Sequence, residues 1–297
     1  MQRERVSENV YWFQSEVYAQ VTAGVIIGPK WAVVIDTLPV PDETLAMKSF
    51  IEDNLEVPVQ YIINTHYHAD HTWGNCFFPG ATIISHELCR KIQLEKGQPS
   101  LDLAIHQNPI FKPVKLVYPH LTFDSGNMTL RVGKKNLILF PTPGHSDDGI
   151  SVLIEEDRVL FAADAFLPIP YFIQGDIEKL IESLNSFTNM GLENIIQGHG
   201  DIILRGEIED TIQQNIQYLK TLKAKVQNAL KDKYPLRTAT AIDVESCGKS
   251  RVLLGGLGET LHNNNVRWLL NQYAKEQGID LVDSPYDDYY DDDIIDE

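Results

Sequence analysis

The order of strands and helices expected along the chain is the feature that most constrains its fold. Runs rich in β-branched and aromatic residues predict strands, and mixed apolar and polar stretches predict helices. In the first half these are strands at residues 10–13, 17–27 and 31–36, a helix at 41–54, strands at 59–64 and 81–84, and a helix at 86–96. In the second half they are strands at 128–132, 136–140, 150–155 and 158–162, a helix at 177–188, a strand at 194–197 and a helix at 207–230. Two such halves predict an α/β sandwich, a pair of sheets covered on the outside by helices.

Three further segments complete the expected organisation. Residues 98–119 contain several prolines and lack periodicity, so we expect a long loop there. The division predicted along the chain is a catalytic domain at residues 1–232, a helical extension at 233–282 with an amphipathic helix at 259–277, and an acidic, disordered tail at 283–297. The tail has eight acidic and no basic residues, with little apolar content to offset the entropy of ordering.

Charge and composition restrict the partners. Lys and Arg total 25 and Asp and Glu total 42, which gives a net charge of −17. Such a surface repels phosphate backbones and anionic lipids, so we expect a small-molecule substrate and neither nucleic acid nor membrane as a partner. We find no apolar run that approaches the ~20 residues of a spanning helix. The three widely spaced cysteines favour a reducing compartment over a disulfide scaffold, and we expect a cytoplasmic protein.

One short segment concentrates metal-binding side chains. The run Asn-Thr-His-Tyr-His-Ala-Asp-His at residues 64–71 follows the expected buried strand at 59–64. Side chains at i and i+2 of extended chain point to the same side, so His66 and His68 can converge on one ion. Asp70 and His71 come after the chain turns and can face a neighbouring ion. Imidazole suits zinc and iron, and a carboxylate adds a hard ligand.

Three later segments add one candidate ligand each. His145 stands in Pro-Gly-His-Ser after an expected strand, Asp164 follows the apolar run Phe-Ala-Ala, and His199 lies in Gly-His-Gly after another expected strand. The glycines beside His199 would let the backbone approach a crowded centre. Each segment alone is weak evidence, but all three follow an expected strand and so reinforce one another.

Together these segments resemble the metallo-β-lactamase superfamily, in particular the branch of dinuclear hydrolases with glyoxalase II. The resemblance covers roughly residues 10 to 230 and implies a four-layer αβ/βα sandwich with metals at one edge of the two sheets. It implies one metal site formed by His66, His68 and His145. It implies a second site formed by Asp70, His71 and His199, with Asp164 bridging both. Asp36, in Val-Val-Ile-Asp-Thr, resembles an aspartate that supports the metal loops, with a simple turn residue as the alternative.

The sequence also departs from some members of the family. Asp164 stands where common zinc β-lactamases have a cysteine, which argues against a true lactamase. A polybasic surface for transfer RNA and a basic set for glutathione are both missing. Residues 262–268, His-Asn-Asn-Asn-Val-Arg-Trp, resemble the C-terminal helix of uncharacterised relatives, which adds membership but no substrate.

The ligand set predicts hydrolysis. Two cations about 3.5–4 Å apart can share a water molecule and lower its pKa toward 7. We therefore expect a dinuclear metal-dependent hydrolase whose metal-bridging hydroxide attacks an ester, thioester, lactone or amide-like bond. Zinc is the first expectation for both divalent ions, with manganese or iron as alternatives. Asp70 is the expected catalytic residue, because it can bind the second cation and orient the hydroxide.

Other readings remain open. Persulfide dioxygenases share the His-x-His-Ala-Asp-His run and use one iron, for which His66, His145 and Asp164 would suffice. The metal content of the protein would separate this oxidoreductase from the hydrolase. A non-catalytic binding module fits poorly with an intact ligand set, and a nuclease fits poorly with the negative charge. Tyr171 is the aromatic residue expected to reach a substrate oxygen. The remaining histidines are expected at the surface or as helix caps, namely His86, His106, His120 and His262.

Overall fold

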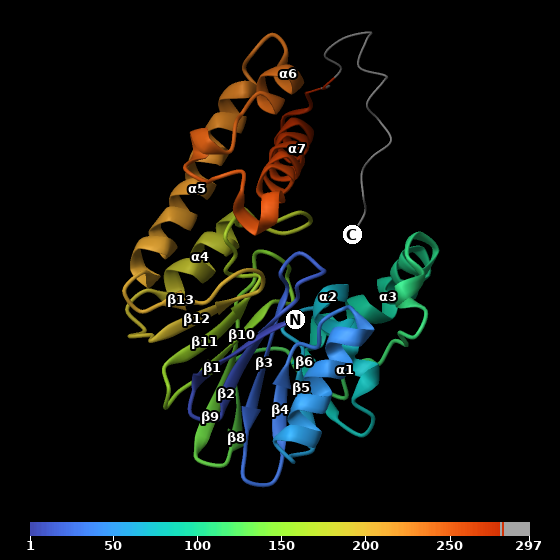
Figure 1. Cartoon of the computed structure of the whole chain (residues 1–297). Helices are drawn as coiled ribbons and strands as arrows, with labels where there is room; N and C mark the ends of the chain where they lie inside the picture. Colours follow the sequence, from blue (N-terminus) through green and yellow to red (C-terminus); the bar gives the residue numbers. More distant parts are fainter. Residues whose placement is uncertain (280, 282–297) are drawn as a thin grey trace.

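Two mixed β-sheets pack face to face at the centre of the molecule (Figure 1). The computed structural model describes residues 1–279 and 281, so the predicted acidic tail at 283–297 lies outside the described residues. The first sheet has the order β1 (Gln2–Ser7), β2 (Val10–Gln14), β3 (Thr22–Ile27), β4 (Ala32–Ile35), β5 (Val59–Ile63), β6 (Thr82–His86) and β7 (Leu121–Phe123). The second has the order β13 (Ile203–Leu204), β12 (Asn194–Gln197), β11 (Val159–Ala163), β10 (Ile150–Ile154), β9 (Lys135–Pro141) and β8 (Met128–Val132).

Alternation along the strands divides the apolar residues between two cores. On β4, Val33 and Ile35 face the second sheet, where they share a core with Val152 and Phe161. The neighbouring residue Val34 faces the opposite way, into a separate outer core. β4, β5 and β6 pair in parallel. β4 is apolar and buried along its whole length, as expected for a parallel strand covered on both faces, whereas β5 and β6 include the polar residues Gln60, Thr82, Ser85 and His86.

Helices cover the outer face of each sheet. On the first sheet lie α1 (Pro41–Ser49) and the π-helical turn that follows it, Phe50–Asn54. On the second lie α4 (Ile177–Phe187) and α5 (Ile208–Ala229), and α6 (Pro235–Thr240) and α7 (Gly258–Gln277) share their core. Helix, sheet, sheet and helix form four layers, so the predicted αβ/βα sandwich is confirmed. Figure 1 shows α7 upright beside the long α5, with the short α6 at the top of the molecule.

The long loop predicted at residues 98–119 is wrong in its first half. Helix α3 (Glu87–Gln107) continues through Pro99, and a single 3-10 turn, Pro109–Phe111, follows. A proline inside a helix costs about 3 kcal/mol, so the sequence by itself predicts a loop at this point. Beyond the proline, Leu101 is buried against Trp73 and Phe111, and this packing stabilises the continued helix.

The N-terminal strands also differ from the prediction. β1 was not expected, because its residues Gln-Arg-Glu-Arg are charged and polar, yet it pairs with β2 as an exposed edge strand. Residues 17–21 form a loop and not the start of a strand. The Ser15 hydroxyl accepts hydrogen bonds from the backbone N–H groups of Val17 and Tyr18 and holds this turn.

Within residues 1–279 and 281, no helix combines the length and the apolar character needed to cross a bilayer.

Candidate metal centre

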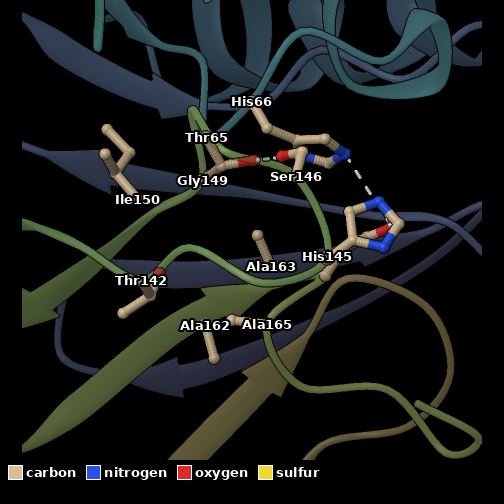
Figure 2. A pocket seen from close by; sticks show the side chains of 11 residues that line it. Thr65, His66, Thr142, His145, Ser146, Gly149, Ile150, Ala162, Ala163 and Ala165 are labelled. Carbon is tan, nitrogen blue, oxygen red and sulfur yellow. Dashed lines mark hydrogen bonds and ion pairs between the residues drawn. The ribbon is translucent and has the colours of Figure 1, made fainter. Parts of the chain in front are cut away.

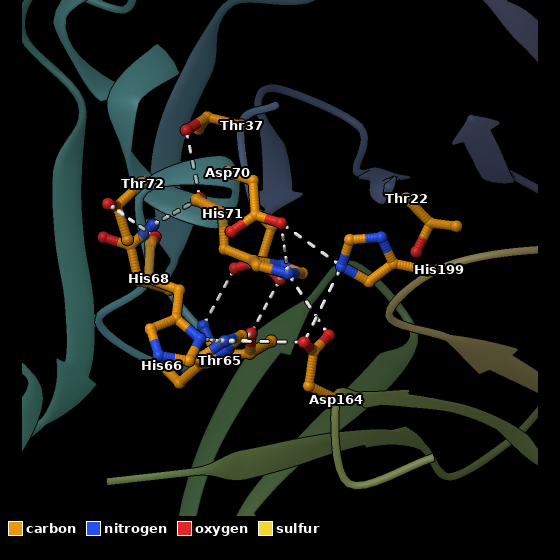
Figure 3. A network of polar contacts seen from close by, with 12 residues as sticks. Thr22, Thr37, Thr65, His66, His68, Asp70, His71, Thr72, Asp164 and His199 are labelled. Atoms are coloured by element: carbon orange, nitrogen blue, oxygen red, sulfur yellow. Dashed lines mark hydrogen bonds and ion pairs between the residues drawn. The ribbon is translucent and has the colours of Figure 1, made fainter. Parts of the chain in front are cut away.

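The seven predicted ligands meet at one edge of the sandwich, beyond the carboxyl ends of the strands. β5 ends at Ile63, directly before the histidine-rich loop, and the short helix α2 (Ala69–Thr72) carries Asp70 and His71. β11 ends directly before Asp164, and β12 ends two residues before His199. Because β11 and β12 are parallel, their carboxyl ends lie at the same edge. Figure 3 shows Asp164 between the His66 side and the His199 side of this arrangement.

One cluster consists of His66, His68, His145 and Asp164, whose ligand atoms all lie within 4.8 Å of one another. His68 Nδ1 lies 2.9 Å from both His66 Nε2 and His145 Nε2. Asp164 Oδ2 lies 3.2 Å from His145 Nε2 and 3.8 Å from His66 Nε2. His66 and His145 also line a small pocket with Thr65 and Ser146, and Figure 2 shows the two rings turned toward each other.

A second cluster consists of Asp70, His71 and His199, again with ligand atoms within 4.8 Å of one another. Asp70 Oδ2 lies 3.2 Å from His199 Nε2 and 3.8 Å from His71 Nε2. Asp164 faces this cluster too, with Oδ1 3.2 Å from His71 Nε2 and Oδ2 3.7 Å from His199 Nε2. The Asp164 carboxylate therefore lies between both clusters, the position that a bridging ligand needs.

The approach of Asp164 depends on a glycine. A Cβ atom at Gly198 would lie 1.8 Å from Asp164 Oδ1 and 2.8 Å from the carbonyl carbon of Ala163. Ala163 itself has a φ of 47°, a conformation that non-glycine residues rarely adopt. Left-handed backbone at a non-glycine residue is costly and tends to occur at functional sites. The segment around Asp164 is therefore shaped to bring the carboxylate into the centre.

Burial keeps two imidazoles of the first cluster neutral, those of His66 and His68. Burial lowers the pKa of His68 to about 3, helped by the nearby His145. Burial also holds the pKa of His66 well below its usual value, helped by the positive potential from His71. Neutral imidazole is the form that coordinates a metal ion. His66 and His68 can therefore each offer a lone pair at neutral pH.

Nearby carboxylates raise the pKa values of the two histidines in the second cluster. Burial by itself lowers the pKa of His71, but the charges of Asp164, Asp70 and Asp36 outweigh it and raise that pKa well above its usual value. The pKa of His199 is raised too, because Asp164 and Asp70 outweigh the effect of burial. The concentrated negative charge favours a proton or a metal cation at this position.

Asp36 connects the histidine-rich loop to the first sheet. One carboxylate oxygen accepts hydrogen bonds from the Thr65 hydroxyl at 2.7 Å and from His71 Nδ1 at 2.8 Å. The other accepts from the Thr65 backbone N–H at 2.9 Å. His71 thus presents Nε2 to the second cluster. Asp36 orients a candidate ligand and is not a simple turn residue.

Two further candidate ligands are oriented by backbone carbonyls. His145 Nδ1 donates to the Tyr171 carbonyl at 2.8 Å, and His199 Nδ1 donates to the Ala19 carbonyl at 2.9 Å. In each case Nε2 faces the clusters. Sequence reasoning missed both partners, because a backbone carbonyl carries no residue-specific signal.

The geometry and chemistry of the donors fit divalent metal ions. Ligands of a tetrahedral site, 2.0–2.1 Å from zinc, lie about 3.3 Å from one another, close to the separations in both clusters. His71 Nε2 and Asp164 Oδ1 are buried, yet neither has a hydrogen-bond partner within the described part of the chain. Buried polar atoms are normally paired, so this pair of orphaned atoms favours a missing ligand. Their role as metal ligands stays a prediction.

The other residues singled out from the sequence are Tyr171 and the histidines outside the two clusters. The Tyr171 ring lies 6.2 Å from the His145 ring, near the first cluster. His86 caps α3 by accepting from the Leu88 backbone N–H, and His106 is exposed, as expected. His262 was wrongly expected at the surface or as a cap: it is 1% exposed between α5 and α7. Packing of α7, which sequence spacing does not reveal, buries it.

The family model of the metallo-beta-lactamase superfamily matches residues 18–199. "Lactamase-like protein nscB" of Trichophyton rubrum is 29% identical over 61% of this chain and 50% of its own length. "Thioesterase pkgB" of Emericella nidulans is 27% identical over 55% of this chain and 41% of its own length. The matches span half or less of the length of these curated relatives.

Solved structures agree on the fold. A metallo-beta-lactamase family protein from Thermus thermophilus superposes with a TM-score of 0.64 at 19% identity, over 92% of this chain and 95% of the other. A stereoselective inverting sec-alkylsulfatase from Pseudomonas superposes with a TM-score of 0.70 at 14% identity, over 91% of this chain and 50% of the other. Since the family model covers more than half of the residues and includes the histidine-rich loop, the chain belongs to the metallo-β-lactamase superfamily.

Proposed function

We propose that this protein is a metal-dependent hydrolase that binds two divalent cations, with zinc as the first candidate, and cleaves an ester, thioester, lactone or amide-like bond of a small molecule. The observation that carries the proposal is the position of the Asp164 carboxylate between two clusters of donors. His66, His68 and His145 would hold one cation, Asp70, His71 and His199 the other, and Asp164 would contact both. The thioesterase name of one relative supports acyl chemistry.

The second cluster favours this proposal over an oxidoreductase with one iron. A single iron would need only two histidines and a carboxylate, which the first cluster already offers. Asp70, His71 and His199 would then form a second buried group of donors without a role. A dinuclear centre uses both clusters.

Bound cations would supply a Lewis acid for the carbonyl and lower the pKa of a water molecule into the neutral range. The protein supplies orientation and proton transfer. Asp70 is the residue we assign to holding the nucleophile's proton, because its side chain is 15% exposed and so more accessible than that of Asp164, at 7%. Without a cation, His71 and His199 hold the pKa of the Asp70 carboxyl below its usual value although burial opposes this. A cation bound between them would keep Asp70 ionised for the same electrostatic reason.

The test combines metal analysis with a substrate panel. Purified protein should contain close to two zinc or manganese ions per chain and hydrolyse at least one class among small esters, thioesters and lactones. A chelator should abolish the activity and added metal should restore it. Asp70→Asn should reduce kcat by about 100-fold or more, because a general acid–base group typically contributes 10²–10⁴-fold.

A matched variant controls for loss of a carboxylate. Asp147 lies on the loop that carries His145, but its side chain is 61% exposed and pairs with Lys179 at the surface. Asp147→Asn should therefore keep full activity. Silence on every carbonyl substrate at two metals per chain would contradict the proposal. Oxygen uptake with a persulfide in an iron-loaded sample would favour the oxidoreductase.

A further inference from the structure

A buried polar network lies between α5 and α7, away from all seven candidate ligands. Tyr218 on α5 and His262 and Asn265 on α7 are each at most 1% exposed. His262 Nε2 lies 2.9 Å from the Ile242 carbonyl, which can only accept, so Nε2 carries the proton. His262 Nδ1 then accepts from the Tyr218 hydroxyl at 3.0 Å, and that oxygen accepts from Asn265 Nδ2 at 3.2 Å. Every donor in this series of hydrogen bonds has an acceptor.

The other bonds of Asn265 reach a loop near the metal centre. Asn265 Nδ2 donates to the Pro170 carbonyl at 2.7 Å, and Asn265 Oδ1 accepts from the Phe172 backbone N–H at 3.3 Å. One side-chain amide therefore bonds the backbone on both sides of Tyr171. With the bond to Tyr218, both amide hydrogens and the amide oxygen are used. The Tyr218 network fixes the orientation of this amide.

The residue held between these two bonds orients a candidate ligand. The Tyr171 carbonyl accepts from His145 Nδ1 at 2.8 Å. This bond places the proton of His145 on Nδ1 and leaves the Nε2 lone pair toward His68 and Asp164. A continuous path of hydrogen bonds thus runs from α7 through Asn265 and the Tyr171 backbone to His145.

We propose that Asn265 is a positioning residue for His145, through which helix α7 sets the metal affinity of the first cluster without contributing a ligand. The inference rests on the proposed metal centre. Groups that orient a metal-binding histidine typically change metal affinity by 10–100-fold when removed. Loss of the amide would let the Pro170–Phe172 backbone shift and would weaken the bond that orients His145. In the second cluster His71 and His199 are oriented by Asp36 and the Ala19 carbonyl, and within residues 1–279 and 281 we find no comparable path of hydrogen bonds from α7 to them. The affinity of the second cluster should therefore stay unchanged.

The test is a zinc titration of the full chain in competition with a chromophoric chelator. The binding event weakened most by His145→Ala identifies the first cluster. Asn265→Ala should weaken this event by 10–100-fold and change the other by less than threefold. Val266→Ala is the matched control, because it truncates the adjacent buried side chain on α7 but leaves the loop bonds in place. It should leave both events unchanged.

A second variant and a spectroscopic signal keep the inference testable if Asn265→Ala unfolds. Asn265→Asp preserves size and can still accept from Phe172, but it cannot donate to the Pro170 carbonyl. It should weaken the same event, and the Nδ1–H signal of His145 in a histidine-labelled NMR spectrum should broaden or shift. Equal weakening of both events, an effect equal to that of Val266→Ala, or an unchanged titration and spectrum would overturn the inference. Wild-type protein that binds no zinc would instead overturn the proposed function.

Discussion

The metal centre and the network around Asn265 are both buried and polar, yet they treat their polar atoms in opposite ways. At the centre, His68 Nδ1 lies 2.9 Å from both His66 Nε2 and His145 Nε2, and one imidazole N–H cannot make a full hydrogen bond to each. Among the residues that the structure describes, His71 Nε2 and Asp164 Oδ1 have no hydrogen-bond partner. In the Asn265 network each hydroxyl, amide and imidazole donor has an acceptor.

This difference distinguishes a binding site from a structural connection. A buried group without a partner costs about 1–3 kcal/mol, so a cluster of such groups is maintained only where something else compensates. A network with every atom paired instead fixes one packing of its helices. We therefore expect variants at the centre to lower the metal content even at saturating zinc. Variants in the network should lower stability and leave the metal content at saturation unchanged, although Asn265 also affects the affinity of the first cluster.

The largest expected effect tests whether the centre is a metal site at all. Asp164→Asn keeps the size of the side chain but removes the charge that faces both clusters. Zinc affinity should fall by more than 100-fold at both, because one carboxylate serves each. Elemental analysis after dialysis against buffered zinc measures this, with Asp147→Asn as the surface control. Near-full zinc occupancy in Asp164→Asn would show that neither cluster depends on this carboxylate.

A smaller loss of zinc affinity, confined to one cluster, should distinguish the two clusters from each other. Asp36→Asn replaces the acceptor that orients His71, and an amide nitrogen would oppose the Nδ1–H or the Thr65 donors. Affinity of the second cluster should fall by 10–100-fold, as for other groups that orient a ligating histidine. The same competition titration measures it. Equal losses at both clusters would indicate a general disturbance of the loop.

His262→Ala should lower the stability of the protein and leave its zinc content at saturation unchanged. The Tyr218 hydroxyl and the Ile242 carbonyl would lose their partner, which we expect to cost about 2 kcal/mol of unfolding free energy. Urea unfolding of the metal-free protein measures this loss, while zinc content at saturation should stay at the wild-type value. His106→Ala on the exposed side of α3 is the control and should change neither quantity. A large loss of zinc at saturation without loss of stability would contradict the structural role that we assign to the His262 network.

The smallest effect concerns a buried charge beside the network. Burial lowers the pKa of Lys249 to about 8 from its ordinary 10.5, and its ammonium group donates to Asn215. Between these two values the unfolded chain binds more protons than the folded one, so this lysine makes stability rise with pH. The stability of Lys249→Met relative to wild type should therefore fall by about 1 kcal/mol between pH 7 and pH 9. Urea unfolding at both pH values checks the sign, and a constant difference would contradict it.

The sequence alone determined the layers and the identity of the candidate ligands. Strand and helix periodicity depends on local side-chain patterns, and these can be recognised without knowing which elements pack against one another. The histidine-rich loop could be interpreted because His66, His68, Asp70 and His71 are close in sequence. Local reasoning failed where long-range packing decided the outcome: Pro99 lies inside α3 because Leu101 is buried against Trp73.

The tertiary structure alone decided which groups orient the ligands. The carbonyls of Tyr171 and Ala19 act through backbone atoms that every residue has, so no residue type marks them. Asn265 and His262 gain their partners only when α7 packs on α5 and on the Pro170–Phe172 backbone, 93–95 residues away in the chain from Asn265. A residue type determines which bonds a side chain can make, whereas the packing of distant elements determines which of those bonds form.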